Sequence, residues 1–213
     1  MKVGIIDYRM GNLASVSKAL EAAGAEPHVS DRLAELSATD LLVLPGVGNF
    51  AAGMANLTSL DLAGYTVDWA AEGKPLLGIC MGMQLFFEES DEGAFGGTPP
   101  ESPPKKTTKG LGIFQGRVER FDDRLKVPHM GWNTVRPVGD SPIFEDFDGR
   151  HFYFVHSYYC RPAREYRGTR TGYGIDFCSA IHASNVVGVQ FHPEKSSDDG
   201  LELLRRMLKE LAP

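Results

Sequence analysis

The sequence lacks long apolar runs, a basic stripe and any abundance of cysteine. No stretch approaches the roughly 20 apolar residues that a membrane-spanning helix needs, and the apolar run near Met1 is too short for a signal peptide. The net charge is -6 and Lys105, Lys106 and Lys109 form the densest basic cluster, which argues against nucleic-acid binding. The three cysteines are an odd number without metal-ligand spacing, so we expect a reducing, cytoplasmic setting and no metal site. We also expect no cofactor.

The first half of the chain alternates between strand and helix patterns. Short apolar runs predict strands at residues 3–7, 26–30, 41–44 and 76–79. Helical spacing predicts one helix that Asn12 caps and Gly24 ends, and another over residues 62–72. A third helix should begin just after Cys80 and carry residues 84–89. This alternation predicts an α/β fold with an open, mostly parallel, doubly wound sheet and helices on both faces.

The second half has a different pattern. Residues 96–109 contain four prolines, which predicts an exposed loop. Short β-rich runs at residues 113–120, 151–156, 170–175 and 186–191 then predict an antiparallel extension of the sheet. A terminal helix follows over residues 200–211. With 213 residues, 42% of them hydrophobic, and no linker or repeat, we expect a single domain spanning residues 1–213.

Cys80 is the strongest candidate nucleophile. It stands between Gly78 and Gly82, where an apolar strand should turn sharply into a helix, and this resembles a nucleophile elbow with sulfur in place of a hydroxyl. Such a turn strains the backbone and leaves little space beside the nucleophile, which explains the glycines. The alternative is that Cys80 is a small buried hydrophobe. Cys160 and Cys178 lack such a setting, so we interpret them as structural.

His192 and Glu194 are candidates for the base and its orienting group. They flank Pro193 just after the apolar run at residues 186–189. Proline favours an extended conformation at His192, and continued extension would project His192 and Glu194 to the same side. The carboxylate could then hold the imidazole toward the sulfur. The alternative is a strand-end histidine beside a solvated glutamate.

A third segment offers oxyanion donors. Gly46 and Gly48 flank Val47 at the end of a predicted strand, which permits an unusual peptide orientation. The N–H groups of Val47 and Met81 could therefore point at a developing negative charge. The alternative is an ordinary strand-to-helix turn.

These three segments, in this order, resemble the triad, or class I, glutamine amidotransferases. Residues 45–48 resemble that family's oxyanion segment, residues 78–84 its nucleophile segment, and residues 188–194 its histidine and glutamate segment. The resemblance implies a flavodoxin-like fold and hydrolysis of glutamine through a cysteinyl thioester. In that reaction Cys80 would be the nucleophile, His192 the proton carrier and Glu194 its orienting group. The implied oxyanion and glutamine-binding residues are Gly46, Val47, Gly48, Met81, Gln84, Ser157 and Tyr158.

Other segments resemble the glutaminase subunits of imidazole glycerol phosphate synthases. They are residues 7–16, 128–133, 153–158 and 192–196, and residues 128–133 are the most discriminating. Arg9 stands where those subunits often carry glycine. The resemblance implies a heterodimer with a separate (β/α)8-barrel cyclase, which uses the ammonia in histidine biosynthesis, and low activity of the glutaminase alone. The implied interface residues are Asn12, Met130, Trp132, Tyr153 and Lys195.

Three other functions stay open at this point. The chain could be the glutaminase of another synthase, making anthranilate, guanylate or pyridoxal phosphate. It could be a cysteine peptidase or γ-glutamyl hydrolase that needs no partner. It could also be a non-catalytic binding subunit, although a scaffold has no need of Cys80, His192 and Glu194 together.

Overall fold

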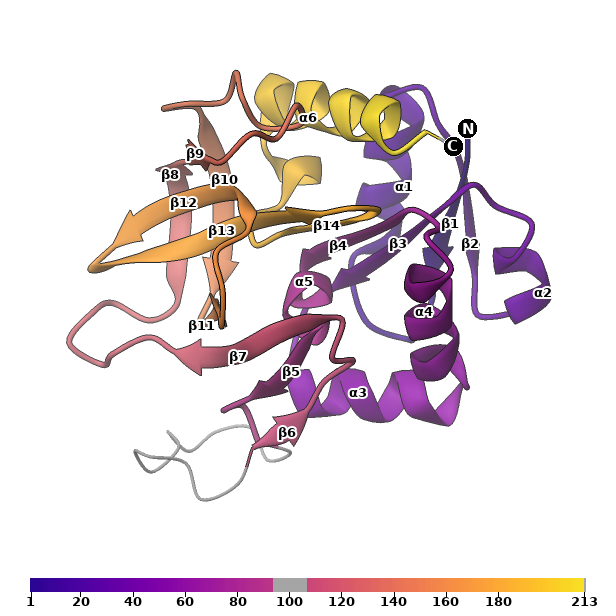
Figure 1. The fold of residues 1–213 in the computed structure, drawn as a ribbon, viewed down its shortest axis with the longest axis horizontal. Coiled ribbons are helices and arrows are strands. Elements are labelled where there is room, and N and C mark those ends of the chain that lie inside the picture. Colours follow the sequence, from indigo (N-terminus) through magenta and orange to yellow (C-terminus); the bar gives the residue numbers. More distant parts are fainter. Residues whose placement is uncertain (94–106, 213) are drawn as a thin grey trace.

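The computed structural model describes residues 1–93 and 107–212 (Figure 1). Most of the loop expected at residues 96–109 lies outside the described residues. Its described end contributes a short strand, β6 (Thr108–Lys109).

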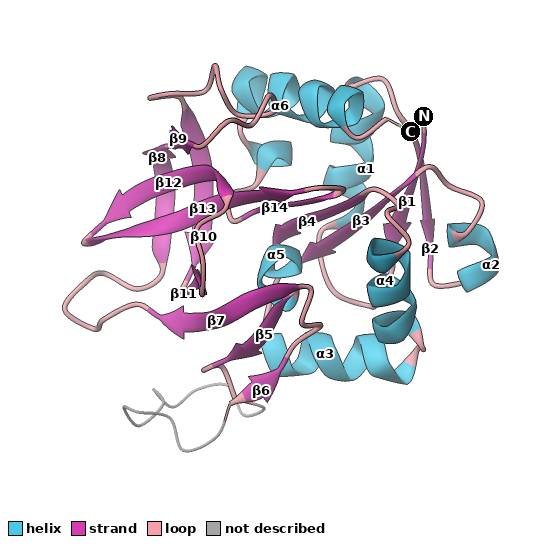
Figure 2. Cartoon of the chain, viewed as in Figure 1, coloured by secondary structure: helices cyan, strands magenta, loops and turns pink. Residues whose placement is uncertain are grey.

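A large mixed sheet forms the centre of the molecule (Figure 2). One half runs in the order β2, β1, β3, β4, β14, and all its neighbouring strands are parallel. The bounds of these strands are β1 (Lys2–Ile6), β2 (Glu26–Ser30), β3 (Leu41–Gly46), β4 (Leu76–Cys80) and β14 (Val186–Val189). The carboxyl ends of β3, β4 and β14 therefore meet at one edge of the sheet, where open α/β sheets keep their sites.

The other half of the sheet is mostly antiparallel. It continues from β14 in the order β13, β11, β7, β5, β6, while β12 pairs with β13 and β9 with β12. The bounds are β5 (Phe87–Ser90), β7 (Phe114–Arg120), β9 (Arg136–Val138), β11 (Tyr158–Pro162), β12 (Arg167–Tyr173) and β13 (Ile175–Ala183). The sheet extension predicted from the sequence is thus present, although β5 and β7 run parallel.

Helices cover both faces of the parallel half (Figure 1). On one face lie α1 (Leu13–Ala22) and α6 (Ser197–Glu210), and on the other lie α3 (Phe50–Ser59) and α4 (Leu62–Ala71). Short helices α2 (Leu33–Leu36) and α5 (Met81–Leu85) complete the set in the described chain. The doubly wound α/β arrangement expected from the sequence is confirmed.

Side chains of each central strand point alternately to the two faces of the sheet and so contribute to two hydrophobic cores. In β3, Leu41 and Val43 join the core beneath α1 and α6, whereas Leu42 and Leu44 join the core beneath α3 and α4. Successive strand residues point to opposite faces, so a strand covered on both faces must be apolar throughout. No helix in the described chain is both long and apolar enough to cross a membrane.

Several local expectations were wrong. The helix after Cys80 ends at Leu85, and Phe87 begins the strand β5 instead of continuing that helix. Residues 170–175 do not form one strand. They include the end of β12 and the start of β13, and the chain turns between these strands at Gly174, which has a φ of 67°. The strand β10 (His151–His156) leaves the main sheet and pairs with β8 (His129–Thr134) in a separate two-stranded sheet.

Arg9 lies in the first turn, in a backbone conformation that is strained for a residue with a side chain. Arg9 has a φ of 65°, in the left-handed region that favours glycine. A hydrogen bond from its backbone N–H to the Asp7 carboxylate, 2.9 Å long, holds this turn. Asn12 then caps α1 as expected, because its side chain accepts from the N–H of Ser15 at 3.2 Å.

Candidate active site

Cys80 occupies a strained turn between β4 and α5. Its φ is 55° and its ψ is -109°, which ordinary side chains rarely adopt. The following turn passes so close to β3 that a Cβ on Gly82 would lie 1.8 Å from the carbonyl oxygen of Leu44. Glycine is therefore required at position 82, and the elbow predicted from the sequence is present.

The thiol of Cys80 is nearly buried and faces two polar groups from distant segments. Gln190 donates to Sγ from its Nε2 at 3.7 Å, and the carbonyl oxygen of Val155 lies 4.0 Å from Sγ. Gln190 directly follows β14, the neighbour of β4 in the sheet. Gln190 is not among the residues predicted from the sequence, because no local pattern links it to a sulfur far away in the chain.

His192 and Glu194 form a buried pair beside this thiol. Nδ1 of His192 donates to Oε1 of Glu194 at 2.7 Å, and each side chain is only 2% exposed. His192 is extended as expected, with a φ of -103° and a ψ of 93°, but the extension does not continue, because residues Pro193–Lys195 make a single 3-10 turn, η1. The turn brings the carboxylate back onto the imidazole.

Nε2, the other ring nitrogen of His192, is available for proton transfer. Nε2 is buried and makes no hydrogen bond of ordinary geometry with any described residue. Burial alone would lower the pKa of His192, but the neighbouring Cys80 thiol and Glu194 carboxylate outweigh it and hold the pKa well above its ordinary value. A protonated imidazole is the form that can deliver a proton to a departing amine.

Backbone hydrogen bonds fix His192 to the strand β10. The N–H of His192 donates to the carbonyl oxygen of Tyr153 at 2.9 Å. The hydroxyl of Ser196 donates to the carbonyl of His192 at 2.6 Å and accepts from the N–H of Tyr153 at 3.0 Å. The orientation of the imidazole is thus tied to the small β8–β10 sheet.

A cavity of about 310 Å³ opens beside the thiol. Its lining contains Cys80 and six of the residues expected to hold glutamine or its oxyanion: Val47, Gly48, Met81, Gln84, Ser157 and Tyr158. Gly46 lies beneath the lining, in register with Cys80 on the adjacent strand. The cavity size is in the range of small-molecule sites.

Gln84 is held within the cavity wall. Its Nε2 donates to the carbonyl of Tyr158 at 2.9 Å and to Oε1 of Gln190 at 3.0 Å. These two bonds use both amide hydrogens and leave the amide oxygen as the group available to a ligand.

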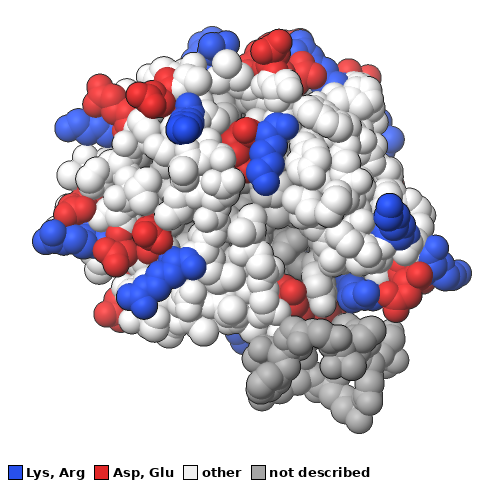
Figure 3. Space-filling view, turned by 180° about the vertical axis from the view of Figure 1, so that it is seen from behind, with Lys and Arg blue, Asp and Glu red and all other residues white. Residues whose placement is uncertain are grey.

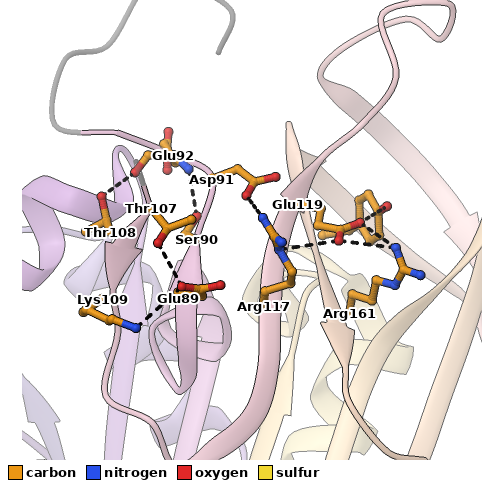
Figure 4. Close-up of polar contacts among 11 residues, drawn as sticks. Glu89, Ser90, Asp91, Glu92, Thr107, Thr108, Lys109, Arg117, Glu119 and Arg161 are labelled. Carbon is orange, nitrogen blue, oxygen red and sulfur yellow. Dashed lines mark hydrogen bonds and ion pairs between the residues drawn. The ribbon is translucent and has the colours of Figure 1, made fainter. Parts of the chain in front are cut away.

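Glu92 also lines the cavity, although it was not predicted from the sequence. Figure 4 shows its contacts with Ser90 and Thr108. Glu92 follows β5, and its Oε2 accepts from the N–H of Phe50, the first residue of α3, at 2.7 Å. Its own backbone bonds to Ser90 and Thr108 fix the loop. Burial raises the pKa of Glu92 even though the Phe50 N–H favours its ionised form. In the sequence, Glu92 belongs to an acidic run that resembles a solvated face, so no local signal marks it.

A chain of hydrogen bonds supports the opposite wall. Nδ1 of His156 donates to the carbonyl of Tyr158 at 2.7 Å, so Nε2 of His156 accepts from Nδ1 of His129 at 3.0 Å. Nε2 of His129 then accepts from the amide of Asn133 at 3.1 Å. Burial lowers the pKa of His129 to about 4 and that of His156 to about 3, so both imidazoles are neutral links.

The strand β8 carries an exposed apolar face. Met130 is 61% exposed and Trp132 is 52% exposed. The Trp132 ring packs edge-on against Tyr153, its partner across the β8–β10 pair, at 6.2 Å between centroids. Asn12 and Lys195 are also exposed. On the face shown in Figure 3, acidic and basic side chains are interspersed and form no continuous basic stripe.

Comparison with known proteins agrees with this geometry. A family model described as "Glutamine amidotransferase class-I" matches residues 4–211. A protein of Moorella thermoacetica, named imidazole glycerol phosphate synthase subunit HisH, is 46% identical over 95% of this chain and 92% of its own length. A protein of the same name from Methanocaldococcus jannaschii is 43% identical over 97% of this chain and 98% of its own length.

Solved structures share the fold at lower identity. A structure titled as a glutamine amidotransferase superposes with a TM-score of 0.73 at 21% identity, covering 97% of each chain. A structure of PurLQS from Thermotoga maritima gives a TM-score of 0.72 at 18% identity, over 99% of this chain and 98% of that one.

Proposed function

Because this chain belongs to the class-I glutamine amidotransferase family, we propose that it is the glutaminase subunit of an imidazole glycerol phosphate synthase. It hydrolyses glutamine to glutamate and ammonia for histidine biosynthesis in the cytoplasm. The observation that carries this proposal is the position of the Cys80 thiol next to His192 of the buried His192–Glu194 pair, in a chain more than 40% identical to synthase subunits over nearly its whole length.

In the proposed reaction, each group near the sulfur has a defined role. Cys80 attacks the side-chain amide carbon of glutamine, and the N–H groups of Val47 and Met81 receive the oxyanion. Each such donor is typically worth about 3 kcal/mol. His192, oriented by Glu194, carries the thiol proton to the departing ammonia. Water then attacks the glutamyl thioester, which releases glutamate and restores the thiol.

The cavity wall supports a specific placement of the substrate. The free amide oxygen of Gln84 and the backbone at Ser157 and Tyr158 can bind the polar groups of glutamine. The carboxylate of Glu92 offers a charged acceptor for the α-ammonium group at the end of the substrate away from the sulfur. We propose Glu92 as a binding residue in addition to those expected from the sequence.

Replacing Glu92 with glutamine should weaken glutamine binding. A charge-assisted hydrogen bond contributes about 1.5–3 kcal/mol, so KM should rise about 10- to 100-fold while kcat changes little. Steady-state glutaminase kinetics of the complex measure both constants. Glu88→Gln is the matched control, because Glu88 lies on β5, the strand that Glu92 follows, and accepts a backbone N–H from Gly116 outside the cavity. An equal KM for the two variants would remove Glu92 from the binding site.

The exposed face of β8 supports a partner interface. We propose that a separate (β/α)8-barrel cyclase covers Met130, Trp132 and Tyr153, with Asn12 and Lys195 at the margin. Ammonia must reach the acceptor before it is lost to solvent, and Val155 connects the two surfaces: it lines the cavity and pairs with Met130. Docking there would place the cyclase next to the site of ammonia release.

Trp132→Ala should weaken the complex without unfolding the subunit. An aromatic hot spot contributes at least about 2 kcal/mol, so the Kd for the cyclase should rise about 30-fold, as measured by calorimetry. Ile175→Ala is the control, since Ile175 is 41% exposed on the β12–β13 hairpin and outside the proposed face. Equal Kd values for the two variants would contradict the proposed interface.

The decisive test combines the chain with its cyclase and follows glutamate formation with and without the ribulosyl-phosphate ligand. We expect strong stimulation by the liganded cyclase and a mass shift on Cys80 with a glutamine-analogue electrophile. Stimulation by an anthranilate or guanylate synthase instead would favour the second candidate, a glutaminase of another pathway. Glutamine hydrolysis by neither complex would defeat the proposal.

A further inference from the structure

The side chain of Tyr8 presents an unexplained polar group next to the candidate active site. Tyr8 lies two residues beyond the end of β1 and is fully buried. Its hydroxyl makes no hydrogen bond with any described residue. Burying a hydroxyl without a partner is unfavourable, and each such group in a native structure calls for an explanation.

The hydroxyl lies against the oxyanion segment. A Cβ placed on Gly46 would be 2.4 Å from the Tyr8 hydroxyl oxygen, so the hydroxyl fills the space that a side chain at position 46 would need. Gly46 is the last residue of β3 and is in register with Cys80 on β4. Burial, and then the nearby Cys80, raise the pKa of Tyr8, so the phenol keeps its proton and remains a donor.

We propose that Tyr8 is a positioning residue for the oxyanion donor: its hydroxyl donates to the Gly46 carbonyl when the Gly46–Val47 peptide turns its N–H toward the substrate oxyanion. This inference deepens the proposed glutaminase function and rests on it. It adds no group that touches the substrate, because Tyr8 acts through the peptide.

The backbone around this peptide can turn. Gly46 has no side chain to collide with the phenol, and Gly48 adopts a φ of 112° that other residues avoid. A carbonyl and the N–H that follows it point in opposite directions across a planar peptide. Directing the Val47 N–H into the cavity therefore directs the Gly46 carbonyl away from it. A buried carbonyl turned in this way needs a donor, and the unpartnered Tyr8 hydroxyl is in contact with that residue.

The expected signature of this role is a gain in stability together with a loss of turnover. Tyr8→Phe removes an unpaired buried hydroxyl from the resting protein, so the Tm should rise by about 2–4 °C. The same variant loses the hydrogen bond that holds the catalytic peptide orientation. In the cyclase complex kcat should therefore fall about 5- to 30-fold, while KM for glutamine should stay within about twofold of the wild-type value.

Tyr65→Phe is the matched control. The Tyr65 hydroxyl is also buried without a partner among the described residues, but it lies on α4, which contributes no residue to the cavity at Cys80. This variant should change kcat by less than about twofold. Alkylation of Cys80 by iodoacetamide supplies the second control, because it needs the sulfur and no oxyanion donor. Tyr8→Phe should leave its rate unchanged.

The outcomes separate this inference from the proposed function. Wild-type complex that does not hydrolyse glutamine would refute the function itself. Wild-type activity with an unchanged kcat for Tyr8→Phe would overturn the role of Tyr8 alone. A kcat loss matched by an equal loss of alkylation rate would also overturn it, since Tyr8 would then act on the thiol. A lowered Tm would show that the hydroxyl already has a stabilising partner in the resting protein.

Discussion

Cys80→Gly is expected to abolish glutamine hydrolysis while leaving the chain at least as stable as Cys80→Ala. Loss of a covalent nucleophile typically lowers kcat by about 10,000-fold or more. Glycine in a strand ordinarily costs about 0.5–1 kcal/mol relative to alanine. At position 80 the φ of 55° reverses this preference, because strain of this kind costs about 1–3 kcal/mol for a residue with a side chain.

Glutamate release and urea unfolding of the two variants measure these effects. Cys80→Ala is the internal control, since it removes the sulfur but keeps the Cβ and its strain. Any residual turnover in either variant above about 1% of wild type would remove Cys80 from the reaction. A Cys80→Gly protein less stable than Cys80→Ala by the ordinary margin would mean that the elbow stores no backbone strain.

Gly82→Ala is expected to destabilise the fold strongly. The added Cβ would lie 1.8 Å from the carbonyl oxygen of Leu44, and this is main chain in the central strand β3. Relief requires β3 and α5 to separate, so the free energy of unfolding should fall by more than about 3 kcal/mol. The chain should also lose glutaminase activity, because Cys80 and Gly46 would shift apart.

Gly64→Ala is the matched control for this prediction. Gly64 lies in the first turn of α4, and a Cβ there would have no atom within 4 Å. The same methyl group should raise stability by about 0.5–1 kcal/mol, as alanine does in exposed helices. Urea unfolding followed by circular dichroism compares the two. Equal stabilities would show that the approach of α5 to β3 is not a constraint on the fold.

The parallel half of the sheet could be predicted from the sequence because burial on both faces leaves an unmistakable pattern. β3 and β4 contain no charged residue, although β3 continues through Pro45 and Gly46, beyond the end predicted at residue 44. The antiparallel half could not be predicted as well. β13 buries every residue from Phe177 to His182, but the polar Ser179 and His182 interrupt the apolar run, so neither alternation nor a continuous apolar stretch marks it. α3 was missed although Asn49 caps it, because its alanines and Gly53 give little helical periodicity.

Some residues of the candidate site could be predicted from the sequence and others could not. Cys80, His192 and Glu194 lie in short motifs whose chemistry can be inferred locally. Glu92 and Gln190 cannot be found in this way, since each acts through a contact with a remote segment: Glu92 with Phe50, and Gln190 with Cys80 and Gln84. The pairing of His192 with Glu194 was expected from a backbone that stays extended beyond His192. His192 is extended, but a tight turn that begins at Pro193 is what brings the two side chains together.

Because two of the three cysteines are buried in the core, the native chain can be labelled selectively at the third for spectroscopy. Cys160 and Cys178 are free thiols enclosed in the core, and burial raises the pKa of both, that of Cys178 to about 12. Cys80 is the cysteine that opens onto the cavity. A fluorinated thiol tag added to the native chain should therefore attach at a single atom, with no cysteine removed beforehand. Its resonance would report directly on how the pocket responds when a second subunit binds.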